Sequence, residues 1–331
     1  MDEAFREGGG QISIETFMRL ALYDENHGYY TKHIKTVGRS GDFSTSATLD
    51  SALGEAIGNW ISERDVIEVG AGDGSLAASI LSSMGWWRRR WLRSYHIVDT
   101  SAPLVAQQKE RLRRFGAKVR WHPDVATALE ACGGVADIFS NELVDAFPAV
   151  VLRWDAQRQR WDEVCVRSDG GEDLVPSEYE CDWDPADGQR IEWHRSYRDW
   201  LGTWVPLWRS GRLLTIDYGG TFPELYWRRP AGTLRAYFSQ MRFDGITECL
   251  QRAGRQDLTA DVNFSDLIAW GEELGLRRGK LVSQREFVSD YVRNLQARAA
   301  KNPALQHLLN PDGAGEAFRV LEQERVRSAD Q

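Results

Sequence analysis

The 331-residue sequence has few cysteines, and they form no recognisable motif. They lie far apart, without a Cys-x-x-Cys pair or a Cys/His cluster: Cys132, Cys165, Cys181 and Cys249. The six histidines also lack the spacing of metal ligands. This pattern argues against a disulfide framework and a zinc site, so we expect no bound metal and a reducing, cytoplasmic location.

Long apolar runs are absent as well. No segment approaches the roughly 18 apolar residues of a membrane span, and the N-terminal MDEAFREGGG is acidic and glycine-rich, so nothing directs the chain to a membrane. The net charge of -8 argues against a surface that follows nucleic-acid phosphates. Lysine is scarce: six lysines stand beside 35 arginines and 14 tryptophans. Solvated surface is the simplest interpretation of that excess, although guanidinium planes stacked on indoles could also line a site.

The composition is otherwise that of a folded chain, with 42% hydrophobic and 27% charged residues. Apolar residues at i, i+3 and i+4 predict helices over 14–22 and 49–61. From Asp65, short apolar runs alternate with helical segments and predict strands over 66–69, 95–99, 118–121 and 135–140. This alternation indicates an α/β fold, with a parallel sheet covered by helices on both faces.

The alternation breaks after Pro148, where 150–154 and 161–166 flank a polar turn and predict a hairpin, followed by an acidic loop to Asp187. Further on, we predict a helix over 191–208, a strand over 212–217, an irregular stretch over 219–263, a helix over 264–274, a capping box at 283–286 and a strand over 318–321. The predicted divisions are a helical cover (1–62), half of an α/β domain (63–148), an insertion (149–210) and the remaining α/β part (211–331).

A glycine-rich turn is the strongest local signal. The first strand runs into Glu68-Val69-Gly70-Ala71-Gly72-Asp73-Gly74, where glycines let backbone amides approach a ligand and a helix N-terminus points at it. Dinucleotide enzymes usually carry Gly-x-Gly-x-x-Gly, but Ser75 stands at the last position here, and Glu68 would repel a pyrophosphate. An acid attracts the sulfonium and ammonium of S-adenosylmethionine, so we predict this methyl donor ahead of NAD.

Asp99 ends the next strand, where a carboxylate can accept two ribose hydroxyls. It follows Gly70 by 29 residues, against about 20 in the standard dinucleotide unit, and a helical extension at 86–91 would absorb the excess. The alternative is an acid that caps a helix. Ser101 is placed to cap the helix that runs to Leu112.

The segment Asn141 to Pro148 follows the fourth strand, at the sheet edge where ligands of open α/β folds bind. Glu142 and Asp145 are three residues apart, so one helical turn would point both carboxylates the same way, a geometry suited to a planar guanidinium. An equal alternative is that Asn141 caps a helix whose first turn carries these acids.

Three more candidates follow. Asp217 and Tyr218 end the fifth strand at the same edge, as site residues or as an ordinary turn. Arg235 lies in the irregular stretch, where it would hold a substrate carboxylate or sit in a surface ion pair. A Gly-x-Ser-x-Gly elbow is missing from the sequence, so a hydrolase is disfavoured.

Several separate strings together resemble the MidA-type, or DUF185, family of S-adenosylmethionine-dependent methyltransferases, which includes the mitochondrial complex I assembly arginine methyltransferase. The strings extend over almost the whole chain: Phe17-Met18 with Gly28-Tyr29-Tyr30, Gly41 to Ser46, Glu68 to Gly74, Asn141-Glu142-Leu143 with Asp145-Ala146 and Pro148, Ile216 to Gly219, Gly232 to Arg235, and Gln256 to Ala260 with Val262-Asn263-Phe264.

The resemblance implies a Rossmann-like methyltransferase domain with a seven-stranded, mostly parallel sheet, an N-terminal helical cover and an inserted substrate-side region. The resemblance places the donor at Glu68, Gly70, Gly72 and Asp99 and makes Asp42, Thr45, Asn141, Glu142 and Asp217 neighbours of the transfer site. Together with the residue patterns above, it gives two predicted groups. The methyl-donor group is Glu68, Gly70, Gly72, Gly74, Asp99, Ser101, Asp124, Asn141, Asp42 and Thr45. The acceptor group has Glu142, Asp145 and Asp217 as catalytic acids and Tyr218, Arg235, Gln240 and Asp261 as substrate contacts.

The chain departs from the family pattern at two positions, where Gln240 and Asp261 replace histidines. These changes favour a small guanidino acceptor, free arginine above all, whose second cationic group Asp261 would meet. The family's protein arginine remains an alternative acceptor. Methylation of a hydroxyl or carboxyl group and a non-catalytic assembly role also remain open, and the sequence does not determine an oligomeric state.

Overall fold

The computed structural model describes residues 1–34, 51–310 and 313–326, and the chain forms two compact units. The first, here called the hairpin unit, comprises 1–34, 144–200 and 219–265. The second, the sheet unit, comprises the described residues within 35–143, 201–218 and 266–331. These boundaries differ from the predicted divisions, because the predicted cover 1–62 contributes to both units and the insertion is joined by 219–265.

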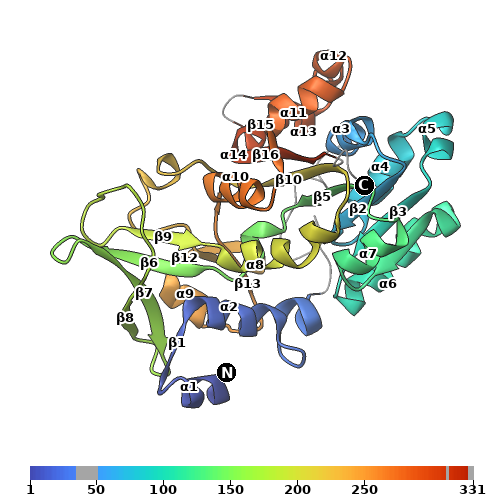
Figure 1. The fold of residues 1–331 in the computed structure, drawn as a ribbon. Coiled ribbons are helices and arrows are strands. Elements are labelled where there is room, and N and C mark those ends of the chain that lie inside the picture. The colour runs from blue at the N-terminus through green and yellow to red at the C-terminus, as the bar shows by residue number, and fades with distance from the viewer. Residues whose placement is uncertain (35–50, 311–312, 327–331) are drawn as a thin grey trace. The chain divides into compact units, whose positions relative to one another are not determined.

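The sheet unit is organised around a sheet with seven strands in its main path. In spatial order they are β15 (Arg277–Ser283), β16 (Phe318–Arg325), β10 (Gly211–Gly220), β5 (Asp137–Asn141), β2 (Asp65–Val69), β3 (Ser94–Val98) and β4 (Val119–His122). The pairs from β10 to β4 are parallel, whereas β16 is antiparallel to both of its neighbours. This confirms the predicted Rossmann-like α/β fold (Figure 1).

The sequence missed β15. Its first four residues, Arg277-Arg278-Gly279-Lys280, are exposed, so this edge strand lacks the apolar alternation by which strands are recognised. The six other strands lie close to their predicted positions, and the parallel ones end at the same edge of the sheet.

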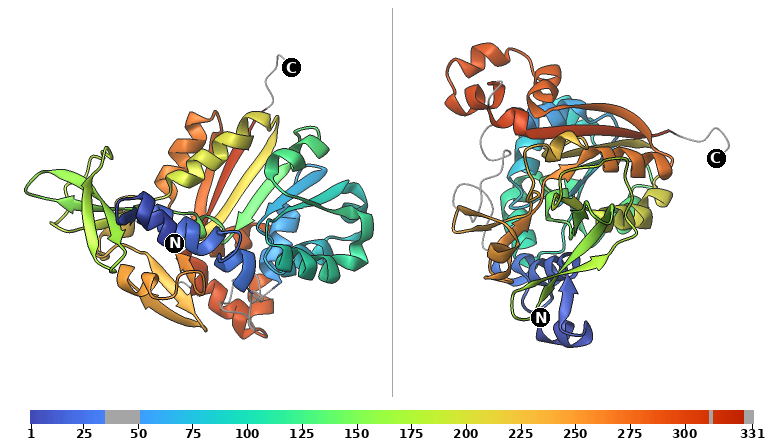
Figure 2. Two further views of the ribbon diagram at one scale, coloured as in Figure 1. Left: turned by 90° about the horizontal axis from the view of Figure 1, so that it is seen from below. Right: turned by 90° about the vertical axis from the view of Figure 1, so that its left-hand side faces the viewer.

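Helices lie on both faces of this sheet (Figure 2). Those in or entering the sheet unit are α3 (Ala52–Trp60), α4 (Ser75–Ser83), α5 (Trp86–Trp91), α6 (Ala102–Leu112), α7 (Val125–Ala131), α8 (Arg195–Trp204), α10 (Phe264–Glu273), α11 (Gln284–Tyr291), α12 (Leu295–Ala299), α13 (Pro303–Leu309) and α14 (Ala314–Ala317), with short 3₁₀ turns at Arg113–Lys118 and Val205–Leu207. In the described part of the chain, none of the helices is long and apolar enough to cross a bilayer.

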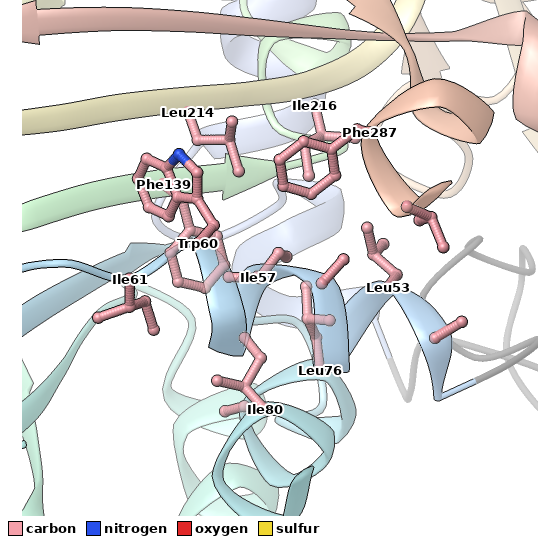
Figure 3. Close-up of a cluster of buried hydrophobic side chains, with 14 of the residues drawn as sticks. Leu53, Ile57, Trp60, Ile61, Leu76, Ile80, Phe139, Leu214, Ile216 and Phe287 are labelled. Carbon is pink, nitrogen blue, oxygen red and sulfur yellow. The ribbon is translucent and has the colours of Figure 1, made fainter. Parts of the chain in front are cut away.

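The main core forms where α3 and α4 pack on the central strands. Phe139, Leu214 and Ile216 project from β5 and β10 toward Ile57 and Trp60 of α3, as Figure 3 shows. These side chains are almost completely buried, so the hydrophobic effect fixes the position of the strand ends that carry the candidate site residues.

The hairpin unit contains two small antiparallel sheets. The first has the order β1 (Gln11–Ser13), β7 (Arg160–Arg167), β6 (Val150–Asp155) and β9 (Arg190–Trp193), with β8 (Glu172–Pro176) paired to β7. The second has the order β12 (Met241–Asp244), β11 (Arg235–Phe238) and β13 (Asp257–Thr259). The remaining elements are α1 (Asp2–Glu7), α2 (Ile14–Tyr23), a π-helical turn (Tyr29–His33), 3₁₀ turns at Val144–Ala146 and Glu224–Tyr226, α9 (Ile246–Leu250) and β14 (Val262–Asn263), which pairs with Gly219 and Gly220.

The structure confirms the predicted hairpin as β6 and β7 but corrects two neighbouring predictions. The predicted helix over 191–208 is wrong at its start, because Ile191 pairs with Leu152 in a strand and α8 begins only at Arg195. The stretch 219–263 is also more regular than predicted. Its strands are only two to four residues long, too short to show a period in the sequence.

The predicted capping box is present at the start of α11. The Ser283 hydroxyl accepts from the Glu286 amide at 3.2 Å, and the Glu286 carboxylate accepts from the Ser283 amide at 3.0 Å. The first turn of the helix thereby keeps its backbone donors paired.

Replacing Ser283 by alanine should lower the free energy of unfolding by about 1 kcal/mol, because one capping acceptor is lost. Ser289→Ala, an exposed substitution in the same helix, should stay within about 0.5 kcal/mol of the parent. Urea unfolding of both variants measures the difference, and equal losses would contradict a specific capping role.

Candidate functional site

The glycine-rich turn between β2 and α4 has the backbone expected of a ligand cradle. Gly70, Gly72 and Gly74 have φ values of 72°, 54° and 80°, in the left-handed region that favours glycine. A Cβ on Gly70 would lie 2.8 Å from Cδ1 of Leu143, and one on Gly74 would lie 3.2 Å from Cα of Gln108. Leu143 and Gln108 therefore leave little room for a side chain at Gly70 and Gly74, and α4 begins directly after the turn.

Glu68 is buried beneath this turn. Tyr95 donates a hydrogen bond to its carboxylate at 2.7 Å. The pKa of Glu68 is raised to about 8, chiefly by loss of hydration; the Tyr95 hydrogen bond lowers it, and the charges of nearby Asp99 and Asp73 raise it. A positive ligand group at this position would restore the ionised form.

Asp99 follows β3 directly and is fixed by two donors. The Ser101 amide donates to one carboxylate oxygen at 2.9 Å, and the Gln108 side-chain amide donates to the other at 2.6 Å. Gln108 also donates to the Gly72 carbonyl at 2.8 Å, so it joins the glycine turn to Asp99. The sequence did not reveal Gln108 as part of the site, because its role depends on contacts across 36 and 9 residues. Burial raises the pKa of Asp99.

Helix α5 explains the long interval before Asp99, whereas the predicted cap at Ser101 is not formed by its hydroxyl. The unusually long interval before Asp99 contains a separate helix, α5, as the predicted extension at 86–91 required. Ser101 does occupy the N-cap position of α6, but its side chain makes no capping hydrogen bond there, so that part of the prediction is wrong. Its backbone amide, rather than its hydroxyl, is bound to Asp99.

Asp124 begins α7 and accepts a hydrogen bond from the Thr127 amide at 2.7 Å. This and other local hydrogen bonds lower the pKa of its carboxyl group. The observed role of Asp124 is thus a helix cap, and its predicted contact with the methyl donor stays a prediction. Asp42 and Thr45, also assigned to the donor, lie outside the described residues.

The loop after β5 corrects the predicted helical turn. Glu142 has a φ of 53°, and only Val144–Ala146 form a short 3₁₀ turn, so Glu142 and Asp145 do not share a helical face and Asn141 caps no helix. The Glu142 carboxylate is instead held at both oxygens. Asn141 Nδ2 and the Tyr218 hydroxyl each donate to it, both at 3.1 Å.

Asp217 fixes the backbone of this loop. Its completely buried carboxylate accepts from the Leu143 amide at 3.1 Å and from the Tyr218 amide at 2.9 Å. The Glu142 amide in turn donates to the Ile216 carbonyl at 2.9 Å. Asp217 therefore acts through the backbone and positions Glu142.

Asp145 belongs to the hairpin unit and is buried there. Its carbonyl accepts from the Ala260 amide at 2.9 Å. Asp145 and Asp257 both raise the pKa of Tyr23 and Tyr30, after the larger effect of burial. Tyr30 donates to Asp257 at 2.7 Å, and its ring stacks on Tyr23 with centroids 5.6 Å apart.

The predicted substrate residues Arg235 and Asp261 belong to one ion-pair group. The Asp261 carboxylate is paired with both Arg235 and Arg229, so a second cation of the substrate would compete with two ion pairs, and the predicted contacts stay predictions. Arg235 is indeed in an ion pair, but a buried one, and it also donates to the Thr233 carbonyl at 3.2 Å and the Tyr237 hydroxyl at 3.1 Å. Gln240 is exposed at the tip of the β11–β12 hairpin, with a φ of 63°.

Asn141 provides the most direct sign of a ligand. Its Oδ1 atom is buried and has no hydrogen-bond partner among the described residues, although it ends the strand beside the glycine turn. An unpaired buried acceptor is costly unless a bound donor satisfies it. Together with the glycine cradle, Glu68 and Asp99, it fits a ligand with an ammonium group, a sulfonium and a ribose diol. The fold and this cradle define the class I S-adenosylmethionine-dependent methyltransferases.

Comparison with known proteins supports the same class of methyltransferase. The family model described as "Putative S-adenosyl-L-methionine-dependent methyltransferase" matches residues 53–282, and the chain belongs to that family. This membership confirms the predicted methyl donor.

The chain is also similar to "Protein arginine methyltransferase NDUFAF7, mitochondrial" of Mus musculus, at 27% identity over 94% of this chain and 80% of that protein. The Caenorhabditis elegans homologue is 25% identical over 78% of this chain and 68% of its own length.

Among solved structures, a COG1565 superfamily protein from Burkholderia thailandensis bound to S-adenosyl-homocysteine has a TM-score of 0.80. It is 25% identical, with coverage of 97% of this chain and 89% of that one. A second COG1565 structure from the same organism has a TM-score of 0.77 at 24% identity and the same coverage, and supports the fold.

The raised pKa of Glu68 gives a pH test of donor binding. Between pH 6 and 7.5 most of the free protein carries a protonated Glu68, whereas a cationic donor favours the carboxylate, so the dissociation constant should fall as the pH rises through this range. Titration calorimetry should also detect proton release. In Glu68→Gln both effects should disappear, and an unchanged pH dependence in this variant would exclude Glu68 as their source.

Proposed function

We propose that this protein transfers the methyl group of S-adenosylmethionine to a guanidino nitrogen of arginine. The observation that carries the proposal is the Glu142 carboxylate, fixed by Asn141 and Tyr218 at the end of β5, next to the strand that leads into the glycine turn. The arginine methyltransferases among its relatives support the same acceptor.

A guanidinium offers no free lone pair at neutral pH, since its pKa is above 12. A carboxylate that binds two of its N–H groups localises the charge away from the reacting nitrogen. The donor supplies an electrophilic methyl group: the nitrogen–carbon bond forms as the carbon–sulfur bond breaks, and the electron pair of the broken bond remains on sulfur. The protein must orient the acceptor nitrogen and take its proton.

We assign these tasks to three acids. Glu142 binds the guanidinium and takes the proton, because its orientation is fixed by two donors on its own unit. Asp145, which lies in the hairpin unit, stays the predicted second carboxylate, a role that comes from the sequence. Asp217 is a positioning residue rather than a proton acceptor, since its oxygens already bind the Leu143 and Tyr218 amides.

For the acceptor itself, we favour free L-arginine, but on a different basis from that given by the sequence. Asp261 carries one negative charge between two arginines, so the ion-pair group of Asp261, Arg229 and Arg235 has an excess of one positive charge. Such a group attracts an anion. Free arginine has an α-carboxylate, which an arginine inside a polypeptide lacks. Arg235 itself belongs to a family motif, so the feature particular to this chain is the carboxylate that immobilises it.

Replacing Glu142 by glutamine should reduce kcat by about 10²-fold or more, because a positioned base typically contributes that much, while donor affinity changes little. Glu130→Gln, at an exposed position on α7, is the matched control and should keep full activity. Single-turnover rates and donor titration measure the two effects. Turnover by Glu142→Gln near that of the control would contradict the assignment.

The choice of acceptor can be tested without a variant. Incubation with labelled donor should give higher kcat/KM for L-arginine than for agmatine, which keeps the guanidinium but lacks the carboxylate. A lost charged hydrogen bond predicts a difference of roughly 10-fold or more. Label only in an arginine-containing peptide would contradict free arginine, and label in none of these acceptors would contradict arginine methylation as a whole.

A further inference from the structure

One face of the sheet unit carries an exposed group of indoles and cations. We call it the Trp–Arg surface; it consists of Arg64, Trp86, Trp87, Arg89, Arg90 and Lys118. Trp86 and Trp87 are 62% and 77% exposed, an unusual state for side chains of this size. A shallow groove is lined by five of these residues, and α5 supplies four of the six. This helix is labelled in Figure 1. The catalytic proposal uses none of them.

The cations of the Trp–Arg surface are not neutralised by nearby acids. Among the described residues, no carboxylate lies within ion-pair distance of Arg64, Arg89, Arg90 or Lys118. Lys118 shows the effect of this crowding, because burial and the charges of Arg90 and Arg64 lower its pKa. A chain with a net charge of -8 thus keeps a local positive field here.

The hairpin unit carries the opposite charge on one segment, residues 178–187, which we call the acidic segment. Its sequence, EYECDWDPAD, alternates acids with larger side chains. Tyr179, Cys181 and Trp183 pack against the core of the hairpin unit, whereas Glu178, Glu180, Asp182, Asp184 and Asp187 are exposed. In the part of the chain that the structure describes, no arginine or lysine pairs with any of these five acids.

We propose that two copies of this protein associate reciprocally, with the acidic segment of each copy bound to the Trp–Arg surface of the other. The two surfaces are complementary in charge, and among the described residues neither surface has an ion pair with a side chain of opposite charge. A two-fold symmetric pair uses both surfaces twice, which is the usual arrangement of homodimers. The exposed indoles supply apolar area, and the opposite charges supply orientation.

The cations of the Trp–Arg surface disfavour a contact between two such surfaces, because that arrangement would place like charges opposite one another. A surface that follows a nucleic acid needs a longer basic track, and the net charge of -8 opposes such a polyanion. Within the acidic segment, four exposed acids stand at alternate positions, Glu178, Glu180, Asp182 and Asp184, whereas Asp187 lies in a turn and accepts a hydrogen bond from the Ala156 amide at 3.1 Å.

Charge reversal tests the pairing directly. One variant, Arg64→Glu with Arg90→Glu, reverses the basic side, and another, Glu180→Arg with Asp182→Arg, reverses the acidic side. Light scattering coupled to gel filtration at 50 mM salt should show the parent as a dimer and each variant as a monomer. An equimolar mixture of the two variants should regain the dimer mass, because each interface then has opposite charges again. At 1 M salt the Debye length is about 3 Å, so the attraction between the opposite charges is weakened and the parent dimer should dissociate more readily.

A third double variant, Glu25→Arg with Glu130→Arg, reverses two exposed acids outside both surfaces and should behave as the parent. Circular dichroism and donor affinity should be unchanged in every variant, which separates lost association from lost folding. A monomeric parent at all concentrations, or a dimer insensitive to the reversals, would refute the proposal. So would a mixture that fails to associate. Binding of a monomeric parent to vesicles rich in phosphatidylglycerol would instead assign the Trp–Arg surface to a membrane.

Discussion

The candidate site depends on one buried interaction, the hydrogen bonds that the Asp217 carboxylate accepts after β10. Parallel strands leave their carboxyl ends at one edge of a sheet, but they do not determine the path of the loops that follow. Asp217 removes that freedom by binding the amides of Leu143 and Tyr218. Leu143 in turn packs behind Gly70. A single carboxylate thus couples the loop that carries Glu142 to the turn that would hold the methyl donor.

The acids of the sheet unit act differently because their surroundings differ. Among the described residues, Asp217 binds the Leu143 and Tyr218 amides, Asp99 binds Ser101 and Gln108, and Glu68 accepts a hydrogen bond from the Tyr95 hydroxyl. The pKa of Glu68 is raised to about 8, chiefly by burial, so a cationic ligand would favour its ionised form. The sequence composition records only a net negative charge, whereas the fold decides which acids are structural and which can respond to a ligand.

The sequence alone predicted the features that are defined by short patterns of neighbouring residues. The glycine turn, the parallel strands and the capping box at Ser283 all follow from short patterns. The loop at 141–146 could not be predicted, because its shape is set by Asp217, which lies 74 residues after Leu143. The contacts of Gln108 and Asp261 could not be predicted either, because their partners are distant in sequence. The edge strand β15 was missed because its residues are charged and exposed.

The left-handed backbone of Glu142 has an evolutionary consequence. A non-glycine residue at a φ of 53° pays a conformational penalty, of order 1 to 3 kcal/mol for such strained positions, which glycine would avoid. Backbone strain alone would therefore favour glycine at this position, whereas the hydrogen bonds to Asn141 and Tyr218 and the proposed binding of a guanidinium both require a glutamate. Under that proposal, the loop at the end of β5 is a place where the protein gives up stability for activity.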